Sequence, residues 1–174
     1  MKMERYIKHM PSPIGEIRLY ASDSALVGLY MENQDKESLL RKYHHARERE
    51  NAILTKAEEE LKAFFAGKLK KFTVPVEVSG TDFQKAVWKN LQVIAYGELR
   101  TYADVARSIF RPSAARAVGG AIGSNPVSII IPCHRVIGSD DSLTGFGGGL
   151  AAKKRLLEIE GHVIRDLKLE KSRC

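Results

Sequence analysis

Hydrophobic and polar positions alternate near the start of the chain in the way that β-strands require. Residues 16–20 (EIRLY) alternate with a period of two, and the apolar run 25–31 (ALVGLYM) follows the polar residues 22–24 (SDS). Two such runs separated by a short polar turn predict a β-hairpin.

Helical spacing follows the hairpin. A highly charged helix is predicted over residues 36–49, and a second over residues 55–67, where apolar residues recur three and four positions apart. Residues 72–76 (FTVPV) form a short extended piece. These elements predict a small α/β unit.

Helices dominate after residue 79. The first spans residues 82–91 and carries one apolar face. Thr101 begins the next, with Asp104 three residues later in the manner of a capping box. After a break at a proline, Ser113 is expected to cap a helix over about residues 114–124. Two short helices joined by a tight break predict a helix-turn-helix.

The change in pattern predicts an α+β fold with two domains. A last helix spans about residues 150–160 and ends at Gly161, a residue suited to the position just after a helix. We place an α/β domain at residues 1–78 and a mainly helical domain at residues 79–174.

Composition adds a charge argument. The formal net charge is +7, with 44% hydrophobic and 28% charged residues. A basic chain is attracted to polyanions such as nucleic acid or an anionic membrane, although charge alone does not choose between them.

Cysteine usage and hydropathy bear on location. The two cysteines, Cys133 and Cys174, form no CxxC pattern, so neither a disulfide framework nor a zinc finger is indicated. No apolar run reaches membrane-spanning length, and the N-terminal residues lack the apolar core of a secretory signal. We expect a cytoplasmic protein that does not enter a membrane.

The second helix of the predicted helix-turn-helix is made almost entirely of small residues, 114–121 (AARAVGGA). Two glycines inside a helix cost roughly 1 kcal/mol each relative to alanine, so something must compensate. Either the helix packs closely against another element, or it closely approaches a ligand. Arg116 stands alone on this surface, which suits a narrow minor groove and the space left by an extruded base.

Cys133 and His134 carry the candidate chemistry. An apolar run ends at Pro132, and the two residues follow at once. A nucleophilic cysteine needs a base or a positive environment, and His134 could supply either, directly or through a water. Because cysteine is often fully buried, a structural thiol remains the alternative from this pair alone.

A histidine base also needs an acceptor that orients its ring. Asp140, Asp141, Glu158 and Glu160 are the downstream candidates. Glu160 is favoured because a carboxylate near a helix C-terminus is disfavoured by the helix dipole and therefore calls for a cationic partner.

The second half of the chain resembles the O6-alkylguanine-DNA alkyltransferases. The resemblance covers residues 83–161 in order and spacing. The segments that carry it are the Trp88 helix, Tyr96-Gly97-Glu98, Thr101-Tyr102, residues 115–121, Asn125-Pro126, Pro132-Cys133-His134-Arg135-Val136, residues 144–150 and residues 156–161. The first 80 or so residues resemble the variable N-terminal domain of that family only loosely.

The resemblance implies both a fold and a reaction. The fold is a ribonuclease H-like N-terminal domain followed by a winged helix-turn-helix domain. Cys133 would accept an alkyl group from O6-alkylguanine, and from O4-alkylthymine, in one irreversible step. His134 would take the thiol proton through a water, Glu160 would polarise His134, and Tyr102 would protonate the leaving base. Asn125 would brace the turn that carries the motif.

The resemblance also implies a DNA surface and a pocket for the flipped base. Arg116 would fill the space of the extruded nucleotide. The other residues assigned to DNA contact are Ala115, Ala117, Gly119, Thr101, Ser113 and Arg135. The base pocket is assigned to Val136, Phe146, Gly147 and Gly148, with Phe146 standing where many family members have tyrosine.

Three further expectations complete the picture. The N-terminal domain lacks cysteines, so we predict no metal site, although some family members carry zinc there. His9, His44 and His45 are expected to face solvent. We expect no cofactor and a monomer whose partner is double-stranded DNA containing O6-alkylguanine.

Three other functions fit parts of the sequence. An alkyltransferase-like protein binds the lesion without transfer but lacks the acceptor cysteine that this chain has. A thiol hydrolase would leave the helix-turn-helix unexplained. A transcription regulator would need a recognition helix richer in side chains that read bases.

Overall fold

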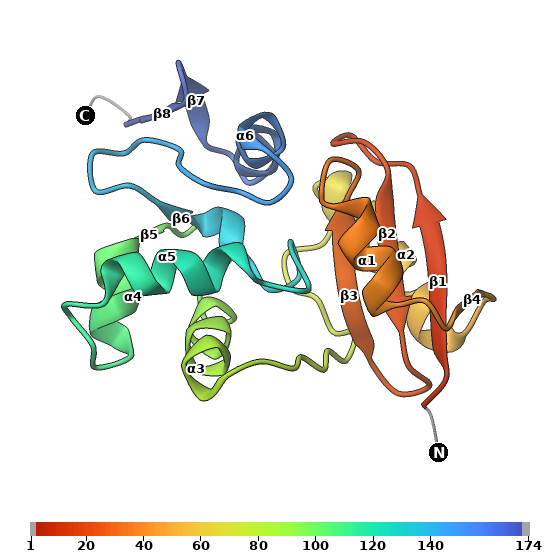
Figure 1. Ribbon diagram of the computed structural model, residues 1–174. Coiled ribbons are helices and arrows are strands. Elements are labelled where there is room, and N and C mark those ends of the chain that lie inside the picture. Colours follow the sequence, from red (N-terminus) through yellow and green to blue (C-terminus); the bar gives the residue numbers. More distant parts are fainter. Residues whose placement is uncertain (1–2, 172–174) are drawn as a thin grey trace.

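The computed structural model describes residues 3–171, which form two units joined by an extended segment (Figure 1). The first unit is a sheet with two helices. Its elements are β1 (Arg5–Met10), β2 (Ile17–Ala21), β3 (Leu26–Met31), α1 (Lys36–Lys42), β4 (Ala46–Glu48) and α2 (Ala52–Phe65).

The sheet has the strand order β3-β2-β1-β4. β2 pairs antiparallel with β1 and with β3, and β4 runs parallel to β1 at the edge. Helix α2 packs on this sheet through a buried face of Leu54, Ala57, Leu61 and Phe64. Ala57, Leu61 and Phe64 belong to the apolar stripe that the sequence predicts, and Leu54 is added because the helix begins at Ala52 rather than at residue 55.

The hairpin prediction is confirmed by β2 and β3, whereas the helix predicted over residues 36–49 is too long. Helix α1 ends at Lys42, and residues 46–48 form the edge strand β4. The physical reason lies at Tyr43, whose ring stacks on Tyr20 with centroids 4.0 Å apart. This packing turns the chain back toward β1, a tertiary contact that overrides local helical spacing.

The second unit is mainly helical. Its elements are α3 (Asp82–Leu91), β5 (Arg100–Thr101), α4 (Tyr102–Ser108), α5 (Ala115–Gly123), the 3-10 turn η1 (Cys133–Arg135), β6 (Val136–Ile137), α6 (Leu150–Ile159), β7 (Val163–Arg165) and β8 (Lys168–Glu170). β5 pairs parallel with β6, and β7 forms an antiparallel hairpin with β8.

Helices α4 and α5 form the predicted helix-turn-helix and pack on each other. Thr101 caps α4, and Asp104 completes the predicted capping box. The expected cap at Ser113 is wrong, because Ala114 occupies the cap position of α5 and makes no side-chain bond there. The turn tightens through a bond from Ala114 N–H to the carbonyl of Arg111, which places Ser113 outside the cap.

The turn between these helices ends α4 in a Schellman motif. The N–H of Phe110 donates to the carbonyl of Arg107, and the N–H of Arg111 donates to the carbonyl of Ala106. Phe110 therefore sits at the left-handed position that glycine normally fills, with φ 60°. For a residue with a Cβ this conformation costs about 1–2 kcal/mol.

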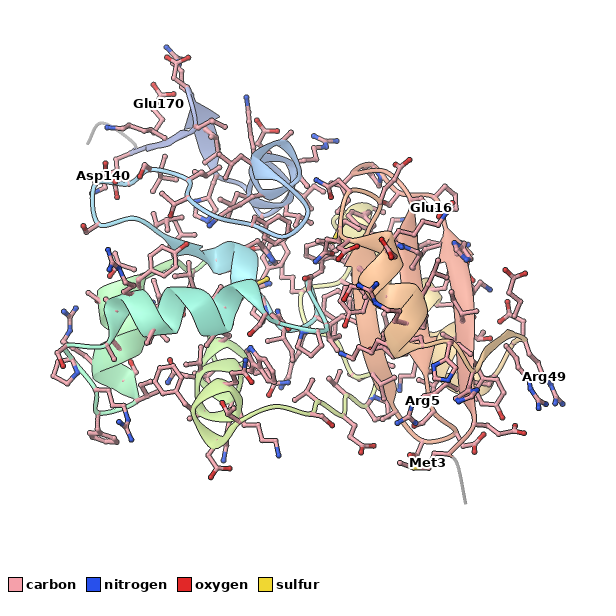
Figure 2. All side chains as sticks on the ribbon, in the orientation of Figure 1. Met3, Arg5, Glu16, Arg49, Asp140 and Glu170 are labelled. Atoms are coloured by element: carbon pink, nitrogen blue, oxygen red, sulfur yellow. The ribbon has the colours of Figure 1, made fainter. Side chains whose placement is uncertain are left out.

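The two units share one core. Leu29 in β3 donates to the carbonyl of Pro126 over 2.8 Å, so the sheet edge continues into the second unit. Side chains fill the space between the ribbons of the two units (Figure 2). Within residues 3–171, no helix is long and apolar enough to cross a membrane.

Candidate active site

The segment between α5 and β6 carries the predicted motif and is held by Asn125. Its amide nitrogen donates to the carbonyl of Ile131 over 2.9 Å, and its Oδ1 accepts from the N–H of Val127 over 3.0 Å. Asn125 is 4% exposed. These two bonds close the loop immediately before Cys133. They are of the kind needed for Asn125 to brace the turn that carries the motif.

Cys133 opens the turn η1 and is buried, with 4% of its surface exposed. Burial raises the pKa of its thiol, because a low-dielectric site disfavours the thiolate. Hydrogen bonding with Asn125 and Ser128, and the positive charge of Lys153, act in the opposite direction. The resting group is therefore a neutral thiol that must lose its proton when it reacts.

His134 and Glu160 are paired inside the protein. His134 Nε2 lies 2.8 Å from Glu160 Oε1, and both side chains are fully buried. Burial lowers the pKa of His134, while the carboxylate opposes that shift. A neutral ring that donates its Nε2 proton to Glu160 leaves Nδ1 as an acceptor. Nδ1 is buried and has no hydrogen-bond partner within residues 3–171.

Arg135 lies inside the protein and not on the predicted DNA surface. It was assigned to DNA contact, but it is 6% exposed and its guanidinium points inward. Nε lies 3.0 Å from both oxygens of Glu160, Nη2 donates to Oε1 over 2.7 Å, and Nη1 donates to the carbonyl of Ile94 over 2.7 Å. We therefore reassign Arg135 to the support of Glu160.

Glu160 is thus an anion held between two partners. Burial alone would raise its pKa, but the hydrogen bonds and charges of His134 and Arg135 hold the pKa at about 2. Gly97 N–H also donates to Oε2 over 3.2 Å. These contacts offset the unfavourable position of a carboxylate at the end of α6.

Lys153 is a site residue that the sequence interpretation missed. It is completely buried on α6, and Nζ donates to the carbonyls of Val136 over 2.5 Å and Thr144 over 2.8 Å. Burial lowers its pKa to about 8, and the nearby Cys133 opposes that shift. A signal was available, because Lys153 lies three positions before Leu156 and four before Leu157 on the apolar face.

A cavity of about 640 Å³ lies between the helix-turn-helix and the loop after β6. Its lining includes Tyr102, Arg116, Gly119, Phe146 and Gly147. The hydroxyl of Tyr102 donates to the carbonyl of Thr144 and accepts from its side-chain hydroxyl, both over 3.1 Å. The cavity thus brings together the expected proton donor, the expected finger and part of the expected base pocket.

The other two residues assigned to the base pocket lie behind this lining. Val136 is fully buried, and its carbonyl accepts from Lys153. Gly148 packs against the N-terminal domain, where an added Cβ would lie 2.7 Å from Met31 Cε. Gly147 is equally tight, since a Cβ there would lie 2.6 Å from Gln34 Nε2.

The small-residue helix α5 presents an open surface. Arg116 and Ala117 are exposed, Ala115 is half-buried, and Ser113 is exposed in the preceding turn. A Cβ on Gly119 would meet only the ring of Tyr102 at ordinary contact distance, and one on Gly120 would meet nothing within 4 Å. Internal packing therefore does not explain these glycines, which favours approach by an external partner.

The sheet domain also reaches this site. The ring of Phe64, at the end of α2, meets the ring of His134 edge-on with centroids 6.4 Å apart. His9, His44 and His45 are exposed, as expected. Residues 3–171 contain no group of three or more His, Cys, Asp or Glu side chains placed to hold a metal ion.

The site combines a buried cysteine with an adjacent histidine–glutamate pair, next to a helix-turn-helix. This combination is typical of proteins that carry a buried thiol at a nucleic-acid-binding motif. Residues 82–162 match the DNA binding domain of 6-O-methylguanine DNA methyltransferase, and residues 5–78 match its ribonuclease-like domain. The chain belongs to the 6-O-methylguanine DNA methyltransferase family.

Individual relatives agree with this assignment. A Haemophilus influenzae protein named methylated-DNA--protein-cysteine methyltransferase is 42% identical over 156 residues, which cover 89% of this chain and 86% of the relative. A crystal structure of the Mycobacterium tuberculosis O6-methylguanine methyltransferase aligns with a TM-score of 0.81 and 44% identity, covering 90% and 92% of the two chains. The M. tuberculosis protein in complex with DNA aligns with the same TM-score and identity, covering 89% and 92%.

Proposed function

We propose that this protein repairs DNA by moving the alkyl group of O6-alkylguanine, and of O4-alkylthymine, to Sγ of Cys133. The observation that carries the proposal is the buried Cys133 next to the His134–Glu160 pair. The family relationship and the M. tuberculosis complex with DNA support the choice of substrate. The base must leave the helix to reach the thiol, at a cost of a few kcal/mol.

The reaction is a displacement at the alkyl carbon. Cys133 gives its proton toward Nδ1 of His134, and the sulfur attacks the carbon as the bond from carbon to O6 breaks. The electron pair of that bond passes to the guanine, which Tyr102 protonates. The products are an S-alkylcysteine and an unmodified guanine.

Three features of the site suit this chemistry. The lowered pKa of His134 keeps its ring neutral and able to accept a proton. Lys153 places a positive charge near the forming thiolate. The burial of Cys133 restricts contact with dissolved electrophiles, so an alkyl group brought to the thiol by a bound base is favoured. A thioether is stable, and each molecule acts once.

The direct test is a mass measurement. Incubation with a duplex containing O6-methylguanine should add one methyl group to the peptide that contains Cys133, up to one per protein molecule. Cys133→Ser should bind the duplex and gain no mass, and the Cys174 peptide of the parent should stay unmodified. Binding without a mass change would instead indicate a lesion-binding module. Repair of more than one lesion per protein molecule would rule out irreversible alkylation of Cys133.

Arg116→Ala is expected to separate base flipping from chemistry. Repair of duplex DNA should slow about tenfold or more, because the extruded base loses the side chain that holds its place. Reaction with free O6-benzylguanine should keep the parent rate, since no base needs flipping. Parallel rate measurements on both substrates check this, and an equal loss on both would contradict the finger role.

The remaining assignments belong to the same proposal. We place the domain boundary between residues 78 and 79, where the extended segment joins α2 to α3. We propose a cytoplasmic monomer that uses neither metal nor cofactor, because the displacement needs only the thiol, a base and a proton donor.

A further inference from the structure

Phe110 is the most exposed large hydrophobic side chain among residues 3–171, with 92% of its surface accessible. It lies in the turn between α4 and α5, at φ 60°, in a position that glycine normally fills. A bulky residue in this region of the backbone is a genuine outlier. Its exposure means that packing inside the chain does not compensate the strain.

The surroundings of Phe110 are basic. Arg107 and Arg111 flank it and are both exposed, and the turn leads within six residues to Arg116 on the first turn of α5. Asp104 is the acidic group on the preceding helix, and it is already paired with Arg107 and with the N-terminus of α4. An aromatic ring among arginines is suited to a partner with closely spaced phosphates and apolar faces between them, which describes DNA.

The turn is also continuous with the small-residue surface of α5. Arg116, Ala115 and Gly119 line the cavity beside Tyr102. A duplex seated on α5 with Arg116 in its minor groove would extend beyond the first turn of the helix, toward residues 109–113. Minor-groove proteins commonly place apolar side chains against sugars and base steps beside their arginines.

We propose that Phe110 is a DNA-contact residue, whose ring packs against the minor-groove wall next to the nucleotide that Arg116 displaces. Arg111 binds a flanking phosphate, while Arg107 keeps its pair with Asp104. The inference rests on the proposed function, since it takes duplex DNA as the partner of α5. It assigns to the turn a role in holding the duplex while the base is out of the stack.

Phe110→Gly gives a test that does not threaten the fold, because glycine is the preferred residue at this backbone position. In a Cys133→Ser background, which prevents transfer, the substitution should weaken binding to an O6-methylguanine duplex about tenfold. The slope of log affinity against log salt should not change, because the lost ring is neutral. Thermal stability should hold or rise.

Two controls sharpen the result. Val93→Ala removes another exposed apolar side chain, 74% accessible and outside the helix-turn-helix, and should leave duplex binding unchanged. With Cys133 intact, Phe110→Gly should react with free O6-benzylguanine at the parent rate while repairing duplex more slowly at subsaturating protein.

Unchanged duplex affinity in Phe110→Gly would overturn the proposed contact. The contact would also be overturned if Phe110→Gly and Val93→Ala weakened duplex binding by the same factor. The outcome is separable from that of the alkyl-transfer proposal. If the parent fails to alkylate Cys133 and Phe110→Gly still weakens duplex binding, the contact stands and the transfer fails. If the parent transfers the methyl group and Phe110→Gly binds normally, only the contact fails.

Discussion

Glu160→Gln should destabilise the fold by about 3–5 kcal/mol, because it leaves the buried guanidinium of Arg135 without its anion. It should also slow alkyl transfer about a hundredfold or more, since His134 loses the charge that helps its ring accept a proton. Glutamine keeps the size of the side chain, so the loss is one of charge. Urea unfolding and the rate with free O6-benzylguanine measure the two effects.

The free energy of unfolding of the parent protein at low pH should depend on the same Glu160 carboxylate. Its pKa is about 2 in the fold against a usual 4.5, so it contributes roughly 3 kcal/mol above pH 4.5. This contribution is lost as the pH falls from about 4.5 toward 2, and Glu160→Gln should lack that part of the profile. Glu158→Gln is the matched control, because Glu158 is partly exposed and pairs with Lys154 only at 3.9 Å. Identical acid profiles for parent and Glu160→Gln would contradict the arrangement.

Lys153→Met should slow transfer at neutral pH about tenfold or more while changing stability little. Holding the ammonium at a pKa of about 8 instead of 10.5 costs roughly 3 kcal/mol at neutral pH, which the substitution removes. Against this, it leaves the carbonyls of Val136 and Thr144 without a donor, at about 1–3 kcal/mol each. The two effects nearly offset, whereas the loss of positive charge near Cys133 has no such compensation.

Lys154→Met is the control for this prediction, since Lys154 is the adjacent lysine and is 40% exposed. It should change neither the rate nor the unfolding curve by more than a few tenths of a kcal/mol. The rate of Lys153→Met should recover partly as the pH rises, because the thiolate fraction then increases without help from the lysine. A normal rate at neutral pH would show that Lys153 serves the fold alone.

Local signals in the sequence predicted much of the architecture. The hairpin, the capping box at Thr101 and the helix ending before Gly161 follow from spacing and end residues, and the structure has all three. The helix expected over residues 36–49 failed where the packing of Tyr43 on Tyr20 decides the path of the chain. That contact joins residues far apart in sequence, and no local pattern encodes it.

The candidate site divides in the same way. Cys133, His134 and Glu160 were selected from chemistry and motif, and the structure brings them together. The family resemblance alone implies a place for Arg135 on the DNA surface, whereas its side chain is buried. Its burial depends on Ile94 and Glu160, which reach it from distant segments. Charged residues that support a site from inside are difficult to predict from sequence, since their partners come from elsewhere in the fold.

Both domains shape the cavity. The lining comes from the helical domain, and residues of the sheet domain lie behind it. Gly147 lies against Gln34 and Gly148 against Met31, so the end of β3 and the turn that follows it lie behind the lining. That turn is itself fixed by Arg18, whose guanidinium donates to the carbonyls of Met31 and Gln34. Substitutions in the sheet domain can therefore reshape the room left for an adduct without altering any group that reacts. Adaptation to a new lesion can therefore proceed through substitutions in the sheet domain as well as in the domain that carries the reacting groups.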